Sequence, residues 1–181
     1  ELGGMQSLMW GLVKEMSKNF MIKVFADYYE NHKEFDKEVN FSIERVGGIK
    51  FLRKIRKAQL INEFLKENKV QGIIADHWKS LELIKPQNLK KTKTFCLLHS
   101  KEINHEKDTS LNKRLIKSTN KADYIIANSK FTKELAIKVG INQSKINIIF
   151  PGIQKPKKIE NLNKVEAEKY FGDSFPKIIT V

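Results

Sequence analysis

Short runs rich in isoleucine and valine alternate about seven times with amphipathic segments along the chain. The clearest of these runs cover residues 72–75, 95–98, 124–127 and 146–150. Strands that are apolar without alternation are buried on both faces, which is typical of a parallel sheet covered by helices. The pattern therefore predicts an α/β fold with a Rossmann-like, doubly wound parallel sheet.

The spacing of apolar residues predicts the other elements: strands over 22–26 and 39–44, and helices over about 6–18, 79–84, 108–119 and 130–139. Ser129 is placed to cap the last of these helices and Gly140 to end it. A long helix is also expected after Gly47-Gly48, with an apolar side and a basic outer side. The apolar side comprises Phe51, Leu52, Ile55, Ala58, Ile61, Phe64 and Leu65, and the outer side Lys50, Arg53, Lys54 and Lys57.

Residues 1–155 are expected to form one N-terminal domain, with a boundary over about 154–162. Residues 156–181 then supply a linker, a helix over about 164–171 and the first strand of a second domain from residue 177. The chain begins at Glu1 with no strand before its first glycine pair, and it ends within an apolar run. We therefore expect a piece of a longer protein, truncated at both ends.

Composition excludes several classes of protein. The one cysteine, Cys96, excludes an internal disulfide framework and a cysteine-rich zinc site, and its apolar surroundings predict a buried side chain. There is neither a signal peptide nor an apolar stretch of the ~18 residues that a membrane span needs, so a cytoplasmic protein is expected. The net charge of +13 is compatible with nucleic acid, an anionic membrane, phosphorylated substrates or a lysine-rich codon bias.

Polar residues directly follow several predicted strands, where open parallel sheets bind ligands. His99 follows the run 95–98 and either bonds a ligand hydroxyl or is satisfied within its loop. After the run 72–75, Asp76 is expected to cap a helix and Trp78 to pack, with His77 as a lesser ligand candidate. Asn128 and Ser129 follow the run 124–127 at a helix start.

A second candidate is the pair Gly3-Gly4, which precedes the first helix. Two glycines let a backbone approach an anion at a helix N-terminus, although such pairs are also common in turns. The histidines lack metal-ligand spacing, so no metal site is predicted. The glycine-rich phosphate-binding motifs of nucleotide-binding proteins are also absent.

The order of these features resembles family 4 glycosyltransferases. Residues 127–135, Ala-Asn-Ser-Lys-Phe-Thr-Lys-Glu-Leu, are similar to the family's A-N-S-x-F-T-x-x-L helix start, and the segment 127–153 is the most specific part. The glycine loop at 3–6, with its helix ending at 13–17, and the segment 98–102, Leu-His-Ser-Lys-Glu, resemble two other family motifs. The last six residues, 176–181, look like the first strand of the family's donor-binding domain.

The resemblance implies the N-terminal, acceptor-side half of a GT-B enzyme. Such enzymes perform retaining, metal-independent transfer from a nucleotide-sugar, which is a co-substrate, to a glycan, lipid-linked or small-molecule acceptor; no cofactor is implied. By carry-over, His99 is the catalytic candidate. The candidate substrate-binding residues are Gly3, Gly4, Lys101, Asn128, Ser129, Pro151 and Gly152.

Some features depart from the family pattern. Ser100 stands where glycine or aspartate is frequent, and Pro151-Gly152 where Asn-Gly is common. The family's opening strand is missing, as are its paired glutamates and basic diphosphate-binding pair. These 181 residues alone are therefore expected not to catalyse transfer.

Three alternatives remain open. The first is a GT-B nucleotide-sugar epimerase, against which the segment 127–135 argues. The second is a basic nucleic-acid-binding module; the long basic helix offers little exposed aromatic surface for it, so no nucleic-acid partner is expected. The third is peripheral contact with an anionic inner membrane face through two basic surfaces, Lys90, Lys91 and Lys93 and, separately, Lys113, Arg114 and Lys117.

Overall fold

The computed structural model describes residues 4–152, 165–166, 168–170 and 172. The chain forms two units, Glu1–Pro151 and Gly152–Val181. In the second unit the described residues 165–166 and 168–170 are helical, within the helix predicted over 164–171. The strand expected from residue 177 lies outside the described residues.

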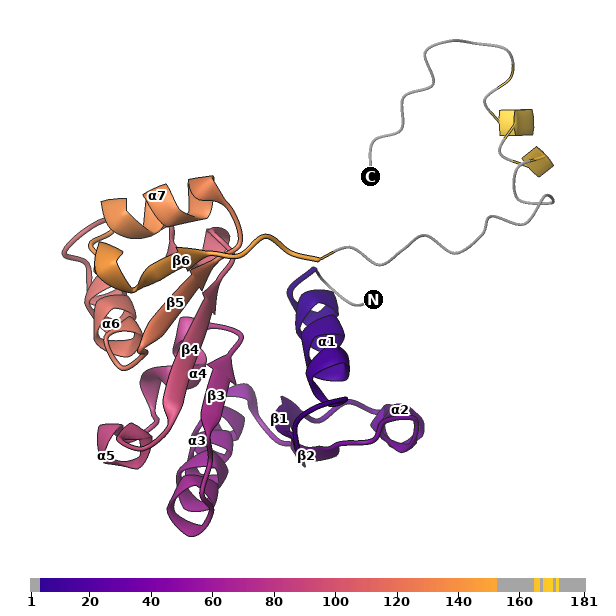
Figure 1. Cartoon of the computed structure of the whole chain (residues 1–181), viewed down its shortest axis with the longest axis horizontal. Helices are drawn as coiled ribbons and strands as arrows, with labels where there is room; N and C mark the ends of the chain where they lie inside the picture. Colours follow the sequence, from indigo (N-terminus) through magenta and orange to yellow (C-terminus); the bar gives the residue numbers. More distant parts are fainter. Residues whose placement is uncertain (1–3, 153–164, 167, 171, 173–181) are drawn as a thin grey trace. The chain divides into compact units, whose positions relative to one another are not determined.

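The first unit contains two parallel sheets (Figure 1). The smaller pairs β1 (Lys23–Asp27) with β2 (Ser42–Val46), and the larger has the order β3 (Gly72–Ala75), β4 (Lys93–Leu98), β5 (Tyr124–Ala127) and β6 (Ile146–Ile148). The α/β class and the parallel strands are confirmed. The strands form two sheets because β1 pairs with β2 and β3 pairs with β4, and no ladder joins β1 to β3 among the described residues.

Each parallel connection passes through a helix, as parallel strands require. The helices are α1 (Gly4–Met16), α2 (His32–Lys37), α3 (Lys50–Glu67), α4 (Trp78–Glu82), α5 (Pro86–Leu89), α6 (Ser110–Thr119) and α7 (Lys130–Lys138), with short 3₁₀ turns η1 (Lys101–Ile103) and η2 (Gln143–Lys145). Helices α2 and α5 were not expected, because six and four residues are too few to show a helical period. None of the described helices is both long and apolar enough to cross a bilayer.

The main core lies on one face of the larger sheet. Cys96, Leu98 and Ile125 point from the strands towards Trp78 of α4 and Leu115 of α6, and all five side chains are buried. The expected burial of Cys96 is thus confirmed, and burial raises the pKa of its thiol. The remaining members of this core include Ala75, Leu81, Ala127, Ala136 and Ile146.

Helix α7 shows why its boundaries were predictable. The Ser129 hydroxyl oxygen accepts a hydrogen bond from the Thr132 amide at 3.1 Å, which caps the helix as expected. Past the other end, Gly140 has a φ of +99°, a conformation that glycine adopts without strain. Both signals are local, so the sequence specified them.

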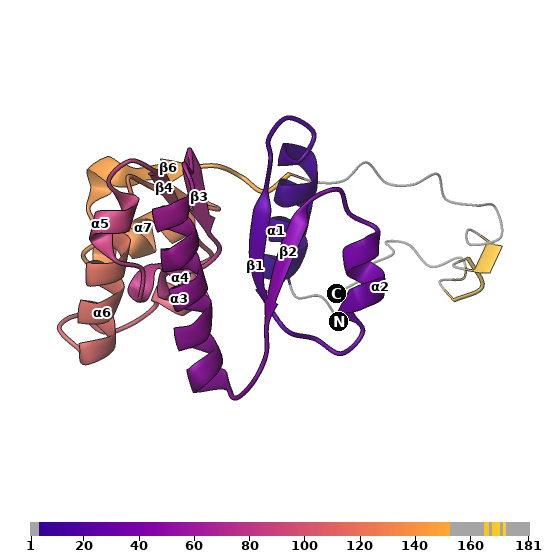
Figure 2. The same ribbon diagram turned by 90° about the horizontal axis from the view of Figure 1, so that it is seen from below.

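Helix α3 contacts β1 and β2 of the smaller sheet, and its buried residues share a cluster with Ile73 of β3 in the larger one (Figure 2). Its Ala58 and Leu65 pack with Ile84 and Leu89, which lie between β3 and β4 along the chain. Phe64 points the other way and meets Phe25 of β1 edge-on, with ring centroids 5.7 Å apart.

The first turn of α3 departs from the sequence prediction. Phe51 and Leu52, expected on its apolar side, are 71% and 45% exposed. Ile49, which precedes the helix, is 74% exposed. Arg53 and Lys57, predicted on the outer side, both pair with Asp27 at the end of β1. The apolar side of α3 is therefore buried in the middle turns of the helix but exposed in its first turn.

Glu82 at the end of α4 joins three helices. Its carboxylate pairs with Lys54 of α3 and accepts two hydrogen bonds from Arg114 of α6, at 2.6 and 3.1 Å. The hydrogen bond from Arg114, together with the bond and charge of Lys54, lowers the pKa of Glu82 to about 2. The ammonium group of Lys121 donates to three carbonyls nearby, those of Leu81, Glu82 and Ile84.

The variant Glu82→Gln is expected to lower the free energy of unfolding by about 2 kcal/mol at neutral pH, because two cations lose a largely buried partner. Since the folded pKa of Glu82 lies below its usual 4.5, the carboxylate stabilises the protein above that pH and the contribution is lost as the pH falls towards 2. Urea unfolding at several pH values measures both effects.

The matched control is Glu15→Gln, because Glu15 pairs with Lys18 but is 72% exposed. Exposed pairs of this kind contribute less than about 1 kcal/mol. Equal destabilisation by the two substitutions, or an unchanged acid dependence in Glu82→Gln, would contradict the assigned role.

Candidate functional site

Three polar segments begin at the same edge of the larger sheet. Ala75 is in register with Cys96, and Leu98 with Ala127, so the carboxyl ends of β3, β4 and β5 lie side by side. The residues that follow these ends are Asp76-His77, His99-Ser100 and Asn128-Ser129. The structure thus brings together three of the candidates that the sequence indicated.

His99 is held by two contacts. Its ring Nε2 lies 3.1 Å from the Asp76 carbonyl oxygen, and its backbone N–H donates to Glu102 Oε1 at 2.6 Å. A carbonyl oxygen can accept a hydrogen bond but cannot donate one, so Nε2 carries the proton. In the neutral ring, Nδ1 is then an acceptor to which a ligand hydroxyl can donate.

Glu102 fixes the turn that carries His99, a role that the sequence analysis missed. Besides accepting from the His99 amide, Glu102 accepts at its carbonyl a 2.9 Å hydrogen bond from the indole N–H of Trp78. Trp78 is fully buried, as predicted. The segment Leu-His-Ser-Lys-Glu contained the signal, since the carboxylate of an acid three residues after His99 can accept a hydrogen bond from the His99 backbone amide.

Ser100 adopts a left-handed backbone with φ of 85°. Such a conformation is strained for a residue with a side chain and persists where surrounding contacts hold it. The bonds from His99 and Trp78 to Glu102 supply that restraint. The family that the sequence resembles often has glycine or aspartate at this position, and glycine adopts such a backbone without strain.

The segment after β3 corrects one expectation. Capping of α4 was assigned to Asp76, whereas His77 performs it: its Nδ1 accepts from the Lys79 amide at 2.9 Å. The Asp76 carboxylate instead accepts from the Ser80 hydroxyl at 2.8 Å. Burial lowers the pKa of His77, although the negative charge of Glu102 opposes this shift. The lowered pKa favours the neutral ring, which the cap needs because Nδ1 must accept a hydrogen bond.

Asn128 and Ser129 are partly occupied by local bonds. The Asn128 side-chain oxygen accepts from the Thr132 hydroxyl at 2.6 Å, and the Ser129 oxygen caps α7. The side-chain NH2 group of Asn128 still has two N–H donors, and the hydrogen bond from Thr132 fixes the orientation of the amide that carries them. Of this pair, Asn128 is therefore the better placed to contact a ligand.

None of the other predicted residues belongs to the three segments of this cluster. Gly4 is the first residue of α1, and a Cβ there would meet nothing within 4 Å. Lys101 is exposed in η1, and Pro151 is exposed after β6. Gly152 belongs to the second unit, and Gly3 lies outside the described residues. The roles given to these five residues stay predictions.

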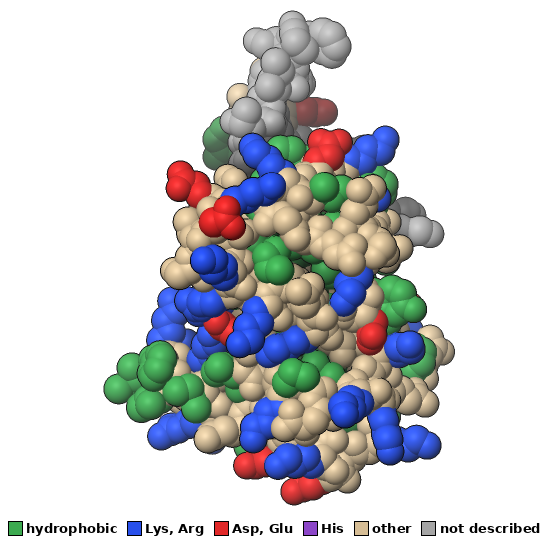
Figure 3. Space-filling view, turned by 90° about the vertical axis from the view of Figure 1, so that its left-hand side faces the viewer, with side chains coloured by type: hydrophobic (Ala, Val, Ile, Leu, Met, Phe, Trp, Pro, Cys, Tyr) green, Lys and Arg blue, Asp and Glu red, His purple; other side chains and the backbone are tan. Residues whose placement is uncertain are grey.

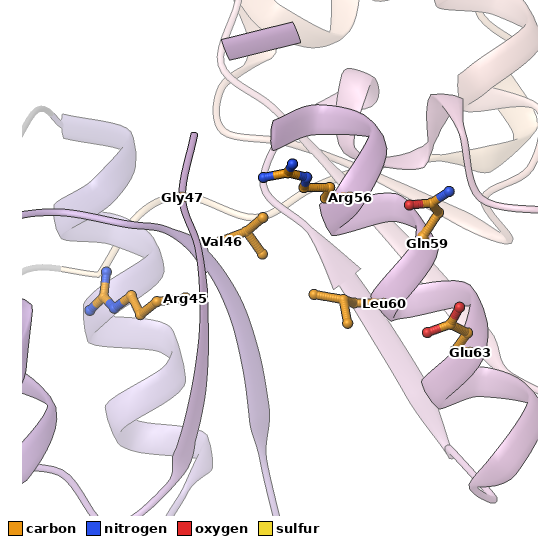
Figure 4. Close-up of a pocket in the computed structure, with 7 residues that line it drawn as sticks. All are labelled: Arg45, Val46, Gly47, Arg56, Gln59, Leu60 and Glu63. Carbon is orange, nitrogen blue, oxygen red and sulfur yellow. The ribbon is translucent and has the colours of Figure 1, made fainter. Parts of the chain in front are cut away.

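A separate cleft of about 300 Å³ lies between the end of β2 and α3 (Figure 4). Val46 and Leu60 form its apolar part and Arg56 lies at its side, whereas the Arg45 side chain points away from α3. Arg45 is already bound, by two hydrogen bonds to the Asp36 carboxylate and one to the Asp27 carbonyl. The cleft contains none of the predicted site residues.

Basic side chains are spread over the surface (Figure 3), with acidic side chains among them. Several of the cations proposed for a basic face are paired, because Arg53 and Lys57 contact Asp27 while Lys54 and Arg114 contact Glu82. The long basic helix nevertheless exposes an aromatic ring, that of Phe51, contrary to the prediction.

Comparison with solved structures places this arrangement in a known fold. The chain is similar to Anabaena Alr3699/HepE in complex with UDP, with a TM-score of 0.69 and 15% identity over 97% of this chain and 49% of that one. The UDP-glucose complex of the same protein gives 0.68 and 15% over 97% and 48%. The chain thus spans about half the length of these structures, and at this identity the likeness concerns the fold.

No curated protein matches the sequence. The family comparison is more decisive, because residues 2–155 match Glycosyltransferase Family 4. That range includes the glycine pair, the His99 turn, the segment 127–135 and the whole larger sheet. The chain therefore belongs to glycosyltransferase family 4.

Proposed function

We propose that this chain is the acceptor-side half of a retaining enzyme that transfers a hexosyl or other glycosyl group from a nucleotide-sugar. The observation that carries the proposal is the orientation of His99 at the carboxyl edge of the sheet, where Nε2 bonds the Asp76 carbonyl and Nδ1 has no partner among the described residues. The family membership over residues 2–155 supplies the reaction class. The acceptor is a glycan, a lipid-linked saccharide or a small molecule.

In this proposal His99 Nδ1 accepts a hydrogen bond from a hydroxyl of the transferring sugar and so orients it. The Asn128 amide donates to the acceptor, and Ser129 maintains the helix that positions it. Because bound groups react faster when held in one geometry, the rigid turn around Glu102 matters as much as the ring itself.

The leaving nucleotide carries negative charge that oriented amides and cations must stabilise. The first amides of α1, which begins at Gly4, and the exposed Lys101 ammonium are the contributions that we assign to this half. The complexes of HepE contain UDP and UDP-glucose, which supports a nucleotide-sugar as the donor. We propose that transfer needs no metal ion and that it occurs in the cytoplasm.

The variant His99→Ala is expected to lower kcat about 100-fold in an enzyme that contains this chain together with a donor-binding half, because the sugar loses its orienting acceptor. Initial rates with a radiolabelled nucleotide-sugar measure the change. His32→Ala, whose ring contacts Tyr28 and the Tyr29 carbonyl away from the cluster, is the control and should retain activity. Equal rates for His99→Ala and the unaltered enzyme would remove His99 from the mechanism.

The 181 residues alone are expected to show no transfer, because they span about half of the HepE chain that binds UDP-glucose. The same chain joined to a donor-binding half should be active, and its product should keep the donor's anomeric configuration. Proton NMR of the new glycosidic bond distinguishes retention from inversion. Turnover by the isolated chain, or an inverted product, would each refute the corresponding part of the proposal.

A further inference from the structure

The turn that leads from β3 into α4 is held by its own side chains. The ring Nδ1 of His77 accepts a hydrogen bond from the Lys79 amide at 2.9 Å, and the Asp76 carboxylate accepts one from the Ser80 hydroxyl at 2.8 Å. The Ser80 amide also donates to the His77 carbonyl at 2.9 Å. Because these bonds restrain Asp76 and His77, they also restrain the peptide group between them.

That peptide group supplies the carbonyl that the His99 ring contacts. The Asp76 carbonyl oxygen lies 3.1 Å from His99 Nε2, and it determines which ring nitrogen carries the proton. Among the described residues, this is the one hydrogen bond that the His99 ring makes. The tautomer of His99 therefore depends on the direction of a single backbone carbonyl.

A second connection passes through the residue that follows His77. The His77 ring lies beside the indole of Trp78, with centroids 5.5 Å apart, and the indole N–H donates to the Glu102 carbonyl at 2.9 Å. The Glu102 carboxylate in turn accepts from the His99 amide at 2.6 Å. The start of α4 is therefore linked to His99 at two points, at the ring through Asp76 and at the backbone through Glu102.

We propose that His77 is a positioning residue, whose cap on α4 selects the tautomer of His99 that leaves Nδ1 as a hydrogen-bond acceptor. Without the cap, the Asp76 peptide group can rotate, and the His99 ring then carries its proton on either nitrogen. A ring protonated at Nδ1 cannot accept a hydrogen bond from a sugar hydroxyl. The use of this tautomer in transfer rests on the proposed function, whereas the tautomer itself is a property of the chain.

Nitrogen-15 NMR of the histidine rings tests the proposal, because the two neutral tautomers give different ring nitrogen shifts. The chain has four histidines, and substituting each in turn assigns the signals. At mildly alkaline pH, where imidazole is neutral, His99 is expected as the Nε2–H tautomer. His32 is an internal reference for the opposite tautomer, because its Nδ1 lies 2.6 Å from the Tyr29 carbonyl oxygen.

The variant His77→Ala is expected to move the His99 signals towards those of the Nδ1–H tautomer. His77→Asn should keep them where they are, because an asparagine side-chain oxygen also caps helices. The matched control is Asn142→Ala, which removes a bond of the same spacing, from the Ser144 amide to Asn142 Oδ1 at 3.0 Å, at the start of η2. This control should leave the His99 signals unchanged.

Three results would overturn the positioning role. They are unchanged His99 signals in His77→Ala, an equal change in Asn142→Ala, and an Nδ1–H tautomer of His99 in the unaltered protein. The last result needs no variant, so it decides the question even where His77→Ala does not fold. Thermal melts identify the variants that stay folded.

Initial rates separate this inference from the proposed function. In an enzyme that joins this chain to a donor-binding half, His77→Ala should lower kcat about tenfold and change KM for the nucleotide-sugar less than about twofold, because His99 is misplaced rather than removed. His77→Asn should recover most of the lost kcat, and equal losses in the two variants would contradict positioning by the cap. Full activity in His99→Ala would instead refute the proposed role of His99 and leave the NMR result valid.

Discussion

The parallel ladder of β3, β4 and β5 is the constraint on which the candidate site depends. Parallel strands end at one edge, so three short segments far apart in sequence open beside one another there. The pairing leaves Asp76 able to hold the His99 ring through its carbonyl. Without that register, the histidine would have no fixed tautomer, and Asn128 would lie elsewhere.

The buried layer beneath the sheet supports the same edge. Trp78 is wholly enclosed, and its indole N–H reaches the Glu102 carbonyl, while the Glu102 carboxylate holds the His99 amide. At the other end of α4, Glu82 joins that helix to α3 and α6. Packing and ion pairing therefore fix α4, whose first residue, Trp78, stabilises the turn that carries His99. The same contacts thus contribute to the stability of the fold and to the geometry of the site.

The charge of the protein shows why composition is a weak guide to function. A net charge of +13 suggests a polyanionic partner, yet Asp27 and Glu82 each bind two of the cations on or near α3. At the start of α3, two cations that form no ion pair among the described residues, Lys50 and Arg56, coincide with the exposed side chains of Phe51 and Leu52. That coincidence depends on which turns of α3 the rest of the protein covers.

The sequence by itself determined the local features: strands 72–75 and 124–127 lie where they were predicted, Ser129 caps α7, and Cys96 is buried. Local spacing and capping specify these features because the interacting groups are close in sequence. The tertiary structure decided the rest, including β2, predicted over 39–44 but found at Ser42–Val46, and the exposure of Phe51. It also decided which atoms hold His99, since hydrogen bonds and burial between distant segments depend on packing that periodicity does not encode.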